Sequence, residues 1–185
     1  MIYLNDDIAH FDFNKALPLL SDQRRDQALK YRYEQGRKTC AAVYLLLCEG
    51  LCQEYGVKEK PVFEYGEYGK PFLSGYPEIH FNMSHCREAA ICVLSDKPVG
   101  VDVESIGRYK ESLARYTMND VEMERIELSE NPDVEFIRLW TMKEAVLKQV
   151  GTGITDNLKS VLTDFSGQVQ TVVNQEKGYI YSVIY

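Results

Sequence analysis

The sequence lacks the features of a membrane-spanning or secreted protein. None of its apolar runs approaches the roughly 18 residues that a membrane-spanning helix needs. The opening stretch, MIYLNDDIAHFDF, has no basic segment followed by an apolar one, as a secretory signal has. The five cysteines are odd in number and form no C-x-x-C pair. We therefore expect a cytoplasmic protein that makes no use of a membrane.

Positive charge is also scarce. The formal net charge is −7, whereas nonspecific binding to nucleic acid or to an anionic membrane needs a basic surface. We therefore expect no nucleic-acid partner, although the stretch from Asp22 to Lys38 is locally rich in Arg and Lys. His85 and Cys86 are adjacent, but no second pair completes a zinc site.

The length and composition are those of a soluble globular protein. Its 185 residues suffice for one large domain or for two small, closely packed ones. Hydrophobic residues make up 45% and charged residues 26%, both of which are ordinary values. Lys97 and Pro98 mark a joint, so we expect an N-terminal half, residues 1–97, and a C-terminal half, residues 98–185.

Both halves are expected to combine helices with antiparallel strands, which is an α+β order. In the first half we predict strands at 2–4, 78–84 and 88–95, and helices at 21–33, capped by Ser21, and at 35–55. In the second half we predict a strand at 99–104, helices at 110–116, 119–128 and 132–150, and strands at 158–165, 168–174 and 178–185. Asn131 is expected to cap the long helix, with Gly151 in a left-handed conformation at its end.

Two acids stand in the otherwise apolar strand predicted at 99–104. Because residues i and i+2 of a strand share a face, Asp102 and Glu104 project together, opposite Val101 and Val103. Two like charges this close repel each other, so a divalent cation or a nearby Lys or Arg is expected between them. The alternative is an exposed face of an edge strand, on which both acids are simply solvated.

A third acid lies on the inward face of the helix predicted at 132–150. At 100° per residue its apolar side chains form one arc, which contains Glu144 and has Lys148 at its edge, whereas Thr141 lies on the other side. An acid on such a face needs a partner. One reading is a local Glu144–Lys148 pair at i, i+4, which is worth only a few tenths of a kcal/mol. The other is that Glu144 joins the acidic pair in a site for a hard cation, Mg²⁺ or Mn²⁺.

Four stretches of the sequence, in order, resemble the signatures of the 4′-phosphopantetheinyl transferases. They are EYGKP at 67–71, HFNMSH at 80–85, VGVDVE at 99–104, and FIRLWTMKEAVLKQVGTGI at 136–154. Their order and spacing are similar to those of the larger Sfp-type branch, and the likeness extends from about Ser21 to Ile154. The resemblance implies a monomer of two pseudo-symmetric halves, each with antiparallel strands packed on helices, and an active site in the cleft between them.

The resemblance also implies an activity. Enzymes of this family move the 4′-phosphopantetheine arm of coenzyme A onto a serine hydroxyl of an apo acyl or peptidyl carrier protein and release 3′,5′-ADP. It implies that Asp102, Glu104 and Glu144 are ligands of Mg²⁺, for which Mn²⁺ can substitute. Lys148 would bind the pyrophosphate and stabilise the charge on the departing 3′,5′-ADP. Glu144, Asp120 or a metal-bound water would accept the proton of the serine.

Further residues match positions that contact coenzyme A in the family. The cofactor-binding positions implied by the likeness are Gly69, Lys70, Pro71, Ser84, His85 and Lys148, with Arg24 and either Arg37 or Lys38 as the clamp on the 3′-phosphate. Taken alone, a single His is more often a structural hydrogen-bonding residue, and Asp120 is equally well explained as an acid in the first turn of a helix. The carrier that is modified stays open.

Two other classes of function compete with the transferase. A noncatalytic module that binds coenzyme A or a carrier protein would keep the basic contacts but tolerate loss of a metal ligand. A Mg²⁺-dependent phosphohydrolase would need the acids but not the YGKP and NMSH stretches. The presence of all three acids and of both stretches favours the transferase.

Overall fold

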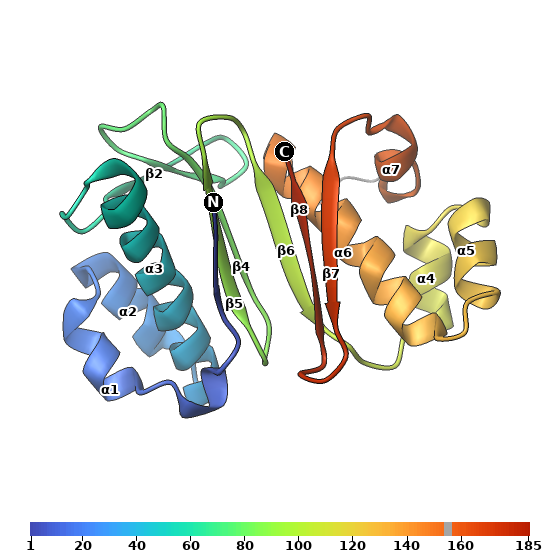
Figure 1. The fold of residues 1–185 in the computed structure, drawn as a ribbon, viewed down its shortest axis with the longest axis horizontal. Coiled ribbons are helices and arrows are strands. Elements are labelled where there is room, and N and C mark those ends of the chain that lie inside the picture. Colours follow the sequence, from blue (N-terminus) through green and yellow to red (C-terminus); the bar gives the residue numbers. More distant parts are fainter. Residues whose placement is uncertain (154–156) are drawn as a thin grey trace.

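The computed structural model describes residues 1–153 and 157–185, and it shows an α+β fold with strands standing between two groups of helices (Figure 1). Ile154, at which the resemblance stops, lies outside the described residues. The strands are β1 (Ile2–Asn5), β2 (Phe63–Tyr65), β3 (Pro71–Leu73), β4 (His80–His85), β5 (Ala90–Ser95), β6 (Gly100–Ser105), β7 (Val169–Asn174) and β8 (Tyr179–Ile184). The α-helices are α1 (Phe13–Ala16), α2 (Asp22–Lys30), α3 (Glu34–Tyr55), α4 (Glu111–Thr117), α5 (Asp120–Glu127), α6 (Pro132–Val150) and α7 (Val161–Asp164). Short 3₁₀ turns lie at η1 (Ile8–His10), η2 (Leu17–Leu19) and η3 (Leu158–Ser160).

The strands form three sheets, all with antiparallel neighbours. Two of them have three strands, in the orders β1-β5-β4 and β6-β8-β7, and the third is the hairpin of β2 and β3. We call the three-stranded sheets the first and the second sheet. β4 lies beside β6, so the two sheets meet along these strands.

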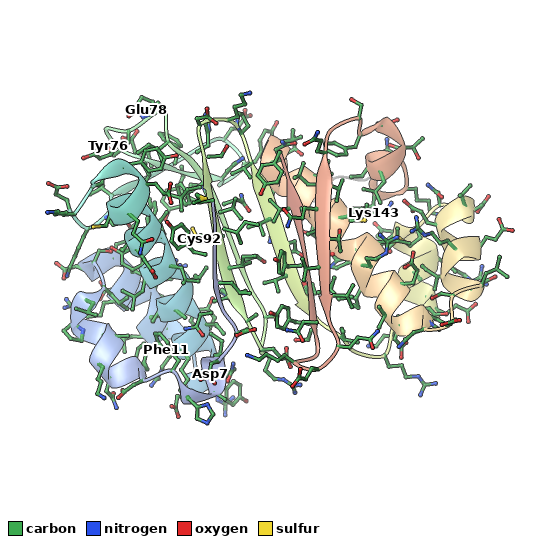
Figure 2. The ribbon with its side chains drawn as sticks, viewed as in Figure 1. Asp7, Phe11, Tyr76, Glu78, Cys92 and Lys143 are labelled. Carbon is green, nitrogen blue, oxygen red and sulfur yellow. The ribbon has the colours of Figure 1, made fainter. Side chains whose placement is uncertain are left out.

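The first sheet buries both of its faces. One face packs on α3, and the apolar cluster between them includes Leu47, Leu51, Cys92 and Leu94, all at most 1% exposed. Cys92 lies among these strands in the interior of the molecule (Figure 2). The other face packs against the second sheet. Burial on both faces explains why β5 is apolar along its length, since neither face meets water.

Strands β6 and β8 of the second sheet are likewise covered on both sides, and this explains the alternation along β6. Val101 and Val103 belong to the apolar cluster that joins the two sheets, together with Ile91 of β5 and Val183 of β8. The opposite face of β6 and β8 is covered by α6. Acids at the alternate positions of β6 therefore face α6, in the interior of the fold.

The ends of α6 are formed as the sequence predicts. The Asn131 side chain accepts a hydrogen bond from the Val134 amide at 3.2 Å, and Pro132 occupies the first turn. Gly151 ends the helix with a φ of +82°, in the left-handed region that glycine adopts without strain. Ser21 also caps α2 as predicted, accepting from the Arg24 amide at 3.2 Å.

Three expectations about local structure are wrong. The segment 158–165 is not a strand but the turn η3 followed by α7, since Leu158, Val161, Leu162 and Phe165 recur at helical spacing and not in alternation. The helix after Ser21 ends at Lys30 and not near residue 33. Thr141 is fully buried, because the second sheet covers more of α6 than its apolar arc alone.

In the two described stretches, 1–153 and 157–185, no helix combines the length and the apolar character needed to cross a membrane.

Candidate functional site

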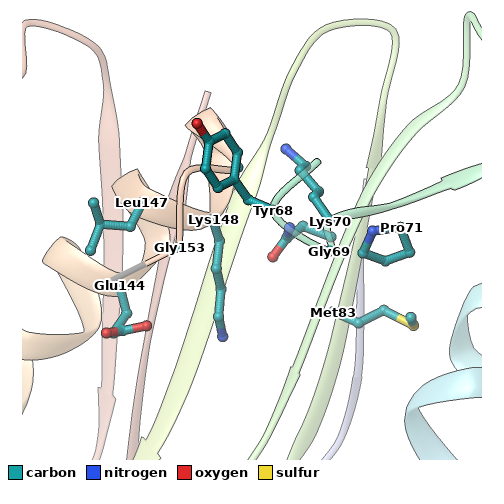
Figure 3. A pocket seen from close by; sticks show the side chains of 11 residues that line it. Tyr68, Gly69, Lys70, Pro71, Met83, Glu144, Leu147, Lys148 and Gly153 are labelled. Carbon is teal, nitrogen blue, oxygen red and sulfur yellow. The ribbon is translucent and has the colours of Figure 1, made fainter. Parts of the chain in front are cut away.

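A cavity of about 310 Å³ opens where the loop before β3, strand β4 and helix α6 come together (Figure 3). The predicted residues that line it are Gly69, Lys70 and Pro71 from the loop and the start of β3, and Glu144 and Lys148 from α6. Glu144 and Lys148 lie one helical turn apart, so both project toward the same space. Residues that are distant in the sequence thus meet in one cavity.

Asp102 is only 3% exposed and contacts Lys148, which lines the cavity. Its Oδ1 atom accepts hydrogen bonds from the Lys148 ammonium at 2.5 Å and from the Ser84 hydroxyl at 2.9 Å. Its Oδ2 atom is buried and has no hydrogen-bonding partner among the residues that the structure describes. The interpretation of β6 as an exposed edge strand is therefore wrong for Asp102, and so is the local pairing of Lys148 with Glu144, since Lys148 reaches across to Asp102 instead.

The carboxylate of Asp102 and the burial of the site affect the pKa values of the other two acids, Glu104 and Glu144. Burial and, second to it, the Asp102 carboxylate together raise the pKa of Glu104 to about 7, against the opposing effect of Lys148. Burial also raises the pKa of Glu144, with the Asp102 carboxylate second and Lys148 opposing. The Oε1 atom of Glu144 is buried and, within residues 1–153 and 157–185, has no hydrogen-bonding partner. Three carboxylates and one ammonium leave this site short of positive charge.

Within residues 1–153 and 157–185, no group of three or more His, Cys, Asp or Glu side chains is arranged to hold a metal ion as it stands. The chemistry of the acids nevertheless fits a hard cation. Asp102 Oδ2 and Glu144 Oε1 are unpaired carboxylate oxygens, which are the donors that Mg²⁺ and Mn²⁺ prefer. The ammonium of Lys148 at present supplies the positive charge beside Asp102.

Ser84 and His85 are the last two residues of β4. Ser84 is buried, and its hydroxyl contacts both Asp102 and Lys148. His85 remains accessible to solvent, yet the surrounding protein lowers the pKa of its ring, and the charges of Arg24 and Lys148 lower it further. The neutral ring is thus favoured, and it lies within electrostatic reach of both cations.

Lys70 connects the loop before β3 to the end of α6. Its ammonium donates to the Gln149 carbonyl at 2.7 Å, and burial lowers its pKa. Gly151 leaves room for this side chain, because a Cβ atom there would lie 2.8 Å from the Lys70 Cδ. Gly69 has a φ of +79°, a conformation that lets the turn bring Lys70 to the cavity.

The remaining predicted residues lie outside the cavity. Arg24 is 9% exposed and donates to the Cys40 carbonyl at 3.2 Å, and its guanidinium lies 5.6 Å from the centre of the Tyr44 ring. Arg37 and Lys38 line another groove at the start of α3, where Lys38 contacts the Ala9 carbonyl. Their role as a 3′-phosphate clamp stays a prediction.

Asp120 is exposed in the first turn of α5, which is the position that its simpler explanation requires. Glu122, two residues later, is the acid that turns inward. It is 7% exposed and pairs at 2.8 Å with Lys143, whose side chain is fully buried. Sequence reasoning missed this pair, although Lys143 lies within the inward arc of α6. It also missed Asn82, which shares a face of β4 with Ser84 by alternation.

Comparison with known proteins identifies the family that the motifs resemble. The family model described as "4′-phosphopantetheinyl transferase superfamily" matches residues 98–183, which include β6 and α6. The chain is 24% identical over 163 residues to a 4′-phosphopantetheinyl transferase of Bacillus subtilis, covering 86% of this chain and 72% of that protein. It is 27% identical over 173 residues to the transferase psf-1 of Bacillus pumilus, covering 92% and 74%.

A third relative has the higher identity but a shorter match. The transferase gsp of Aneurinibacillus migulanus is 34% identical over 139 residues, which is 71% of this chain but only 57% of that protein. Sfp itself, from Bacillus subtilis strain 168, matches over 86% of the chain at 24% identity. With the four motifs, the family model and these relatives in agreement, the chain belongs to the 4′-phosphopantetheinyl transferase superfamily, and the prediction of a transferase of the Sfp type is confirmed.

Proposed function

We propose that the protein transfers the 4′-phosphopantetheine moiety of coenzyme A to a serine hydroxyl of an apo carrier protein, in a Mg²⁺-dependent reaction that releases 3′,5′-ADP. The observation that carries the proposal is the meeting of Lys70, Glu144 and Lys148 in one cavity, where Lys148 pairs with the buried carboxylate of Asp102. Two ammonium groups suit the phosphates of coenzyme A, and the acids suit a divalent cation.

In this proposal the chain has two halves, 1–97 and 98–185, and coenzyme A lies between them. The lining of the cavity supports this division, since its loop and β4 come from the first range and α6 from the second. Each half supplies one ammonium group: Lys70 belongs to the first half and Lys148 to the second. Because one chain provides both walls, we propose that it acts as a monomer, and we place it in the cytoplasm, where coenzyme A and apo carrier proteins meet.

We assign the divalent cation, Mg²⁺ or Mn²⁺, to Asp102, Glu104 and Glu144. When bound, the cation neutralises charge on the pyrophosphate of coenzyme A and thereby favours departure of 3′,5′-ADP. The unpaired oxygens of Asp102 and Glu144 support the assignment, as does the high pKa of Glu104, which reports a site in need of positive charge. Lys148 then leaves Asp102, and its ammonium binds the phosphates.

We assign the general base to Glu144. It lines the cavity, and its pKa is raised by burial, which makes its carboxylate a better proton acceptor. The serine oxygen forms a bond to the β-phosphorus of coenzyme A, its proton moves to the Glu144 carboxylate, and the bond to 3′,5′-ADP breaks. Asp120 is less suited to this role, because it is exposed in the first turn of α5 and does not line the cavity.

The test is transfer to an apo carrier protein, followed by intact-mass spectrometry. With coenzyme A and Mg²⁺, the carrier gains the mass of phosphopantetheine. We expect the Asp102→Ala variant to abolish the gain, and the Asp96→Ala variant, which removes an exposed acid before β6, to leave it unchanged. Transfer without any divalent cation contradicts the role of the metal. Release of free phosphopantetheine without transfer supports a phosphohydrolase instead.

A further inference from the structure

β4 and β6 are joined by side chains, and this junction places Ser84 beside the acids. Asn82 and Ser84 alternate along β4, and both reach main-chain amides of β6. The Asn82 Oδ1 accepts from the Val101 amide at 3.1 Å, and the Ser84 Oγ accepts from the Val103 amide at 3.3 Å. Both side chains are more than nine-tenths buried. They therefore satisfy two β6 amides that would otherwise be buried without partners.

The hydroxyl of Ser84 has a further task that Asn82 does not share. Besides the Val103 amide, its oxygen accepts from the Lys148 ammonium at 3.0 Å, and it donates its own hydrogen to Asp102 Oδ1 at 2.9 Å. A serine hydroxyl has one hydrogen and two lone pairs, so these three bonds use all of its capacity. The hydroxyl has no bond left for a phosphate.

These bonds fix the orientation of the Asp102 carboxylate. Ser84 and Lys148 both engage Oδ1, so the other oxygen, Oδ2, is held in place without a partner. We infer that Ser84 is a positioning residue, which acts through Asp102 by holding Oδ2 toward the proposed divalent cation. The inference rests on the proposed function for the cation, and it differs from the direct contact with coenzyme A that the resemblance implies.

The inference explains why a residue of β4 should control a carboxylate of β6. When the Lys148 ammonium moves to the phosphates, Ser84 becomes the remaining donor that holds Asp102 Oδ1. Without the hydroxyl the carboxylate can rotate, and its two oxygens become equivalent in their surroundings. Hydrogen-bonding partners of metal ligands typically change metal affinity about 10- to 100-fold when they are removed.

The experiment measures Mn²⁺ binding directly, from the electron paramagnetic resonance signal of the free ion, with and without coenzyme A but with no carrier present. For Ser84→Ala we expect Mn²⁺ to bind about 10-fold more weakly. Asn82→Ala is the matched control, because it also leaves a buried β6 amide without a partner but touches no carboxylate. We expect it to lower the melting temperature by a similar amount while the Mn²⁺ affinity stays at the wild-type value.

A conservative variant separates positioning from folding. Ser84→Thr keeps the hydroxyl, so we expect it to restore the Mn²⁺ affinity even where the added methyl group lowers the melting temperature. Two results overturn the inference. If Ser84→Ala and Asn82→Ala lose Mn²⁺ affinity equally, then the junction between β4 and β6 has a purely structural role. Unchanged Mn²⁺ binding in Ser84→Ala, with a higher KM for coenzyme A, means a direct phosphate contact.

The proposed function and this inference can fail separately. If the wild-type protein binds Mn²⁺, Ser84→Ala weakens that binding, and no carrier protein is modified, then the transfer reaction is wrong and the inference stands. If the wild-type protein modifies a carrier but Ser84→Ala binds Mn²⁺ as the wild type does, then the transfer stands and the inference is wrong. Failure of the wild-type protein to bind Mn²⁺ under either condition overturns the inference as well.

Discussion

The two long helices, α3 and α6, each cover one three-stranded sheet, but they are held by different interactions. α3 packs on the first sheet through an apolar face that includes Val43, Leu47 and Leu51. The buried face of α6 also carries Thr141, Lys143 and, at its edge, Lys148. Buried apolar area holds α3 on its sheet, whereas hydrogen bonds and ion pairs hold much of α6. The candidate site lies at these polar contacts of α6.

Three polar side chains on the buried face of α6 find their partners on other elements. Thr141 shares a hydrogen bond of 2.8 Å with Ser182 of β8, and Lys148 pairs with Asp102 of β6. Lys143 donates to the Leu158 carbonyl at 2.7 Å and pairs with Glu122 of α5 (its place on α6 is labelled in Figure 2). Removal of one partner therefore leaves a buried polar group or charge behind, which apolar packing never does.

The largest effect is expected from breaking the Lys143–Glu122 pair. Lys143→Met leaves a buried carboxylate without its cation and should lower the free energy of unfolding by about 3–5 kcal/mol. Addition of Glu122→Gln should recover most of the loss, because the amide oxygen still accepts from the Asn119 amide at the start of α5. Denaturant unfolding measures both. A loss below about 1 kcal/mol for the single variant would place the pair among weak surface interactions.

A comparison of two glycines contrasts the two helices more directly. At Gly100 of β6 a Cβ atom would lie 1.9 Å from the Ala145 carbonyl oxygen and 2.6 Å from the Gln149 amide nitrogen, both in the main chain of α6. We expect Gly100→Ala to force α6 away from the second sheet and to cost about 3 kcal/mol. The helix would also move Glu144 and Lys148, so transfer activity should fall with stability.

Gly50 of α3 is the control for this substitution. Its added Cβ atom would meet the ends of two side chains, the Leu94 Cδ1 at 2.4 Å and the Tyr3 Cε2 at 2.8 Å, which can move aside. The better helix propensity of alanine, about 1 kcal/mol, offsets part of the strain. We therefore expect a smaller loss than at Gly100, measured by the same unfolding. A larger loss at Gly50 would contradict the view that α3 adapts and α6 does not.

Much of the difference between α3 and α6 could be predicted from the sequence, because strand alternation and helix caps are local features. Alternation along β6 placed its acids on one face, and the cap signals at Asn131 and Gly151 gave both ends of α6. The i, i+4 rule, however, paired Lys148 with its neighbour Glu144. The true partner, Asp102, lies 46 residues away, and only the packing of α6 on β6 brings the two together.

The errors have the same origin. Thr141 falls outside the apolar arc of α6, and its burial depends on a hydroxyl partner, Ser182, on a strand that follows much later. Asp120 is exposed in the first turn of α5, whereas Glu122, two residues later, turns inward, which the sequence did not indicate. Periodicity alone cannot separate a residue that caps a helix from one that also pairs across to Lys143. Tertiary partners of polar groups are thus what the sequence left undetermined.

The smallest expected effect concerns a contact that ties the two sheets together away from the site. Asp6, just after β1, accepts from Lys177 at 2.8 Å and from the Tyr179 hydroxyl at 2.9 Å, both at the β7–β8 hairpin. The bond from Lys177 lowers the pKa of Asp6 below its ordinary value of 3.8, and Tyr179 adds to this effect. A lowered pKa means that the carboxylate stabilises the fold above pH 4 and that this stabilisation is lost as the pH falls through the folded-state pKa.

We expect Asp6→Asn to lower the melting temperature by about 2 °C at pH 7 and to have no effect near pH 2, as differential scanning calorimetry can measure. Asp7→Asn removes the neighbouring carboxylate, which pairs within its own turn with His10, and should change the melting temperature less. Equal effects of the two variants at pH 7 would mean that this contact contributes no more than local charge and that the sheets are held together by their shared apolar cluster and the β4–β6 junction alone.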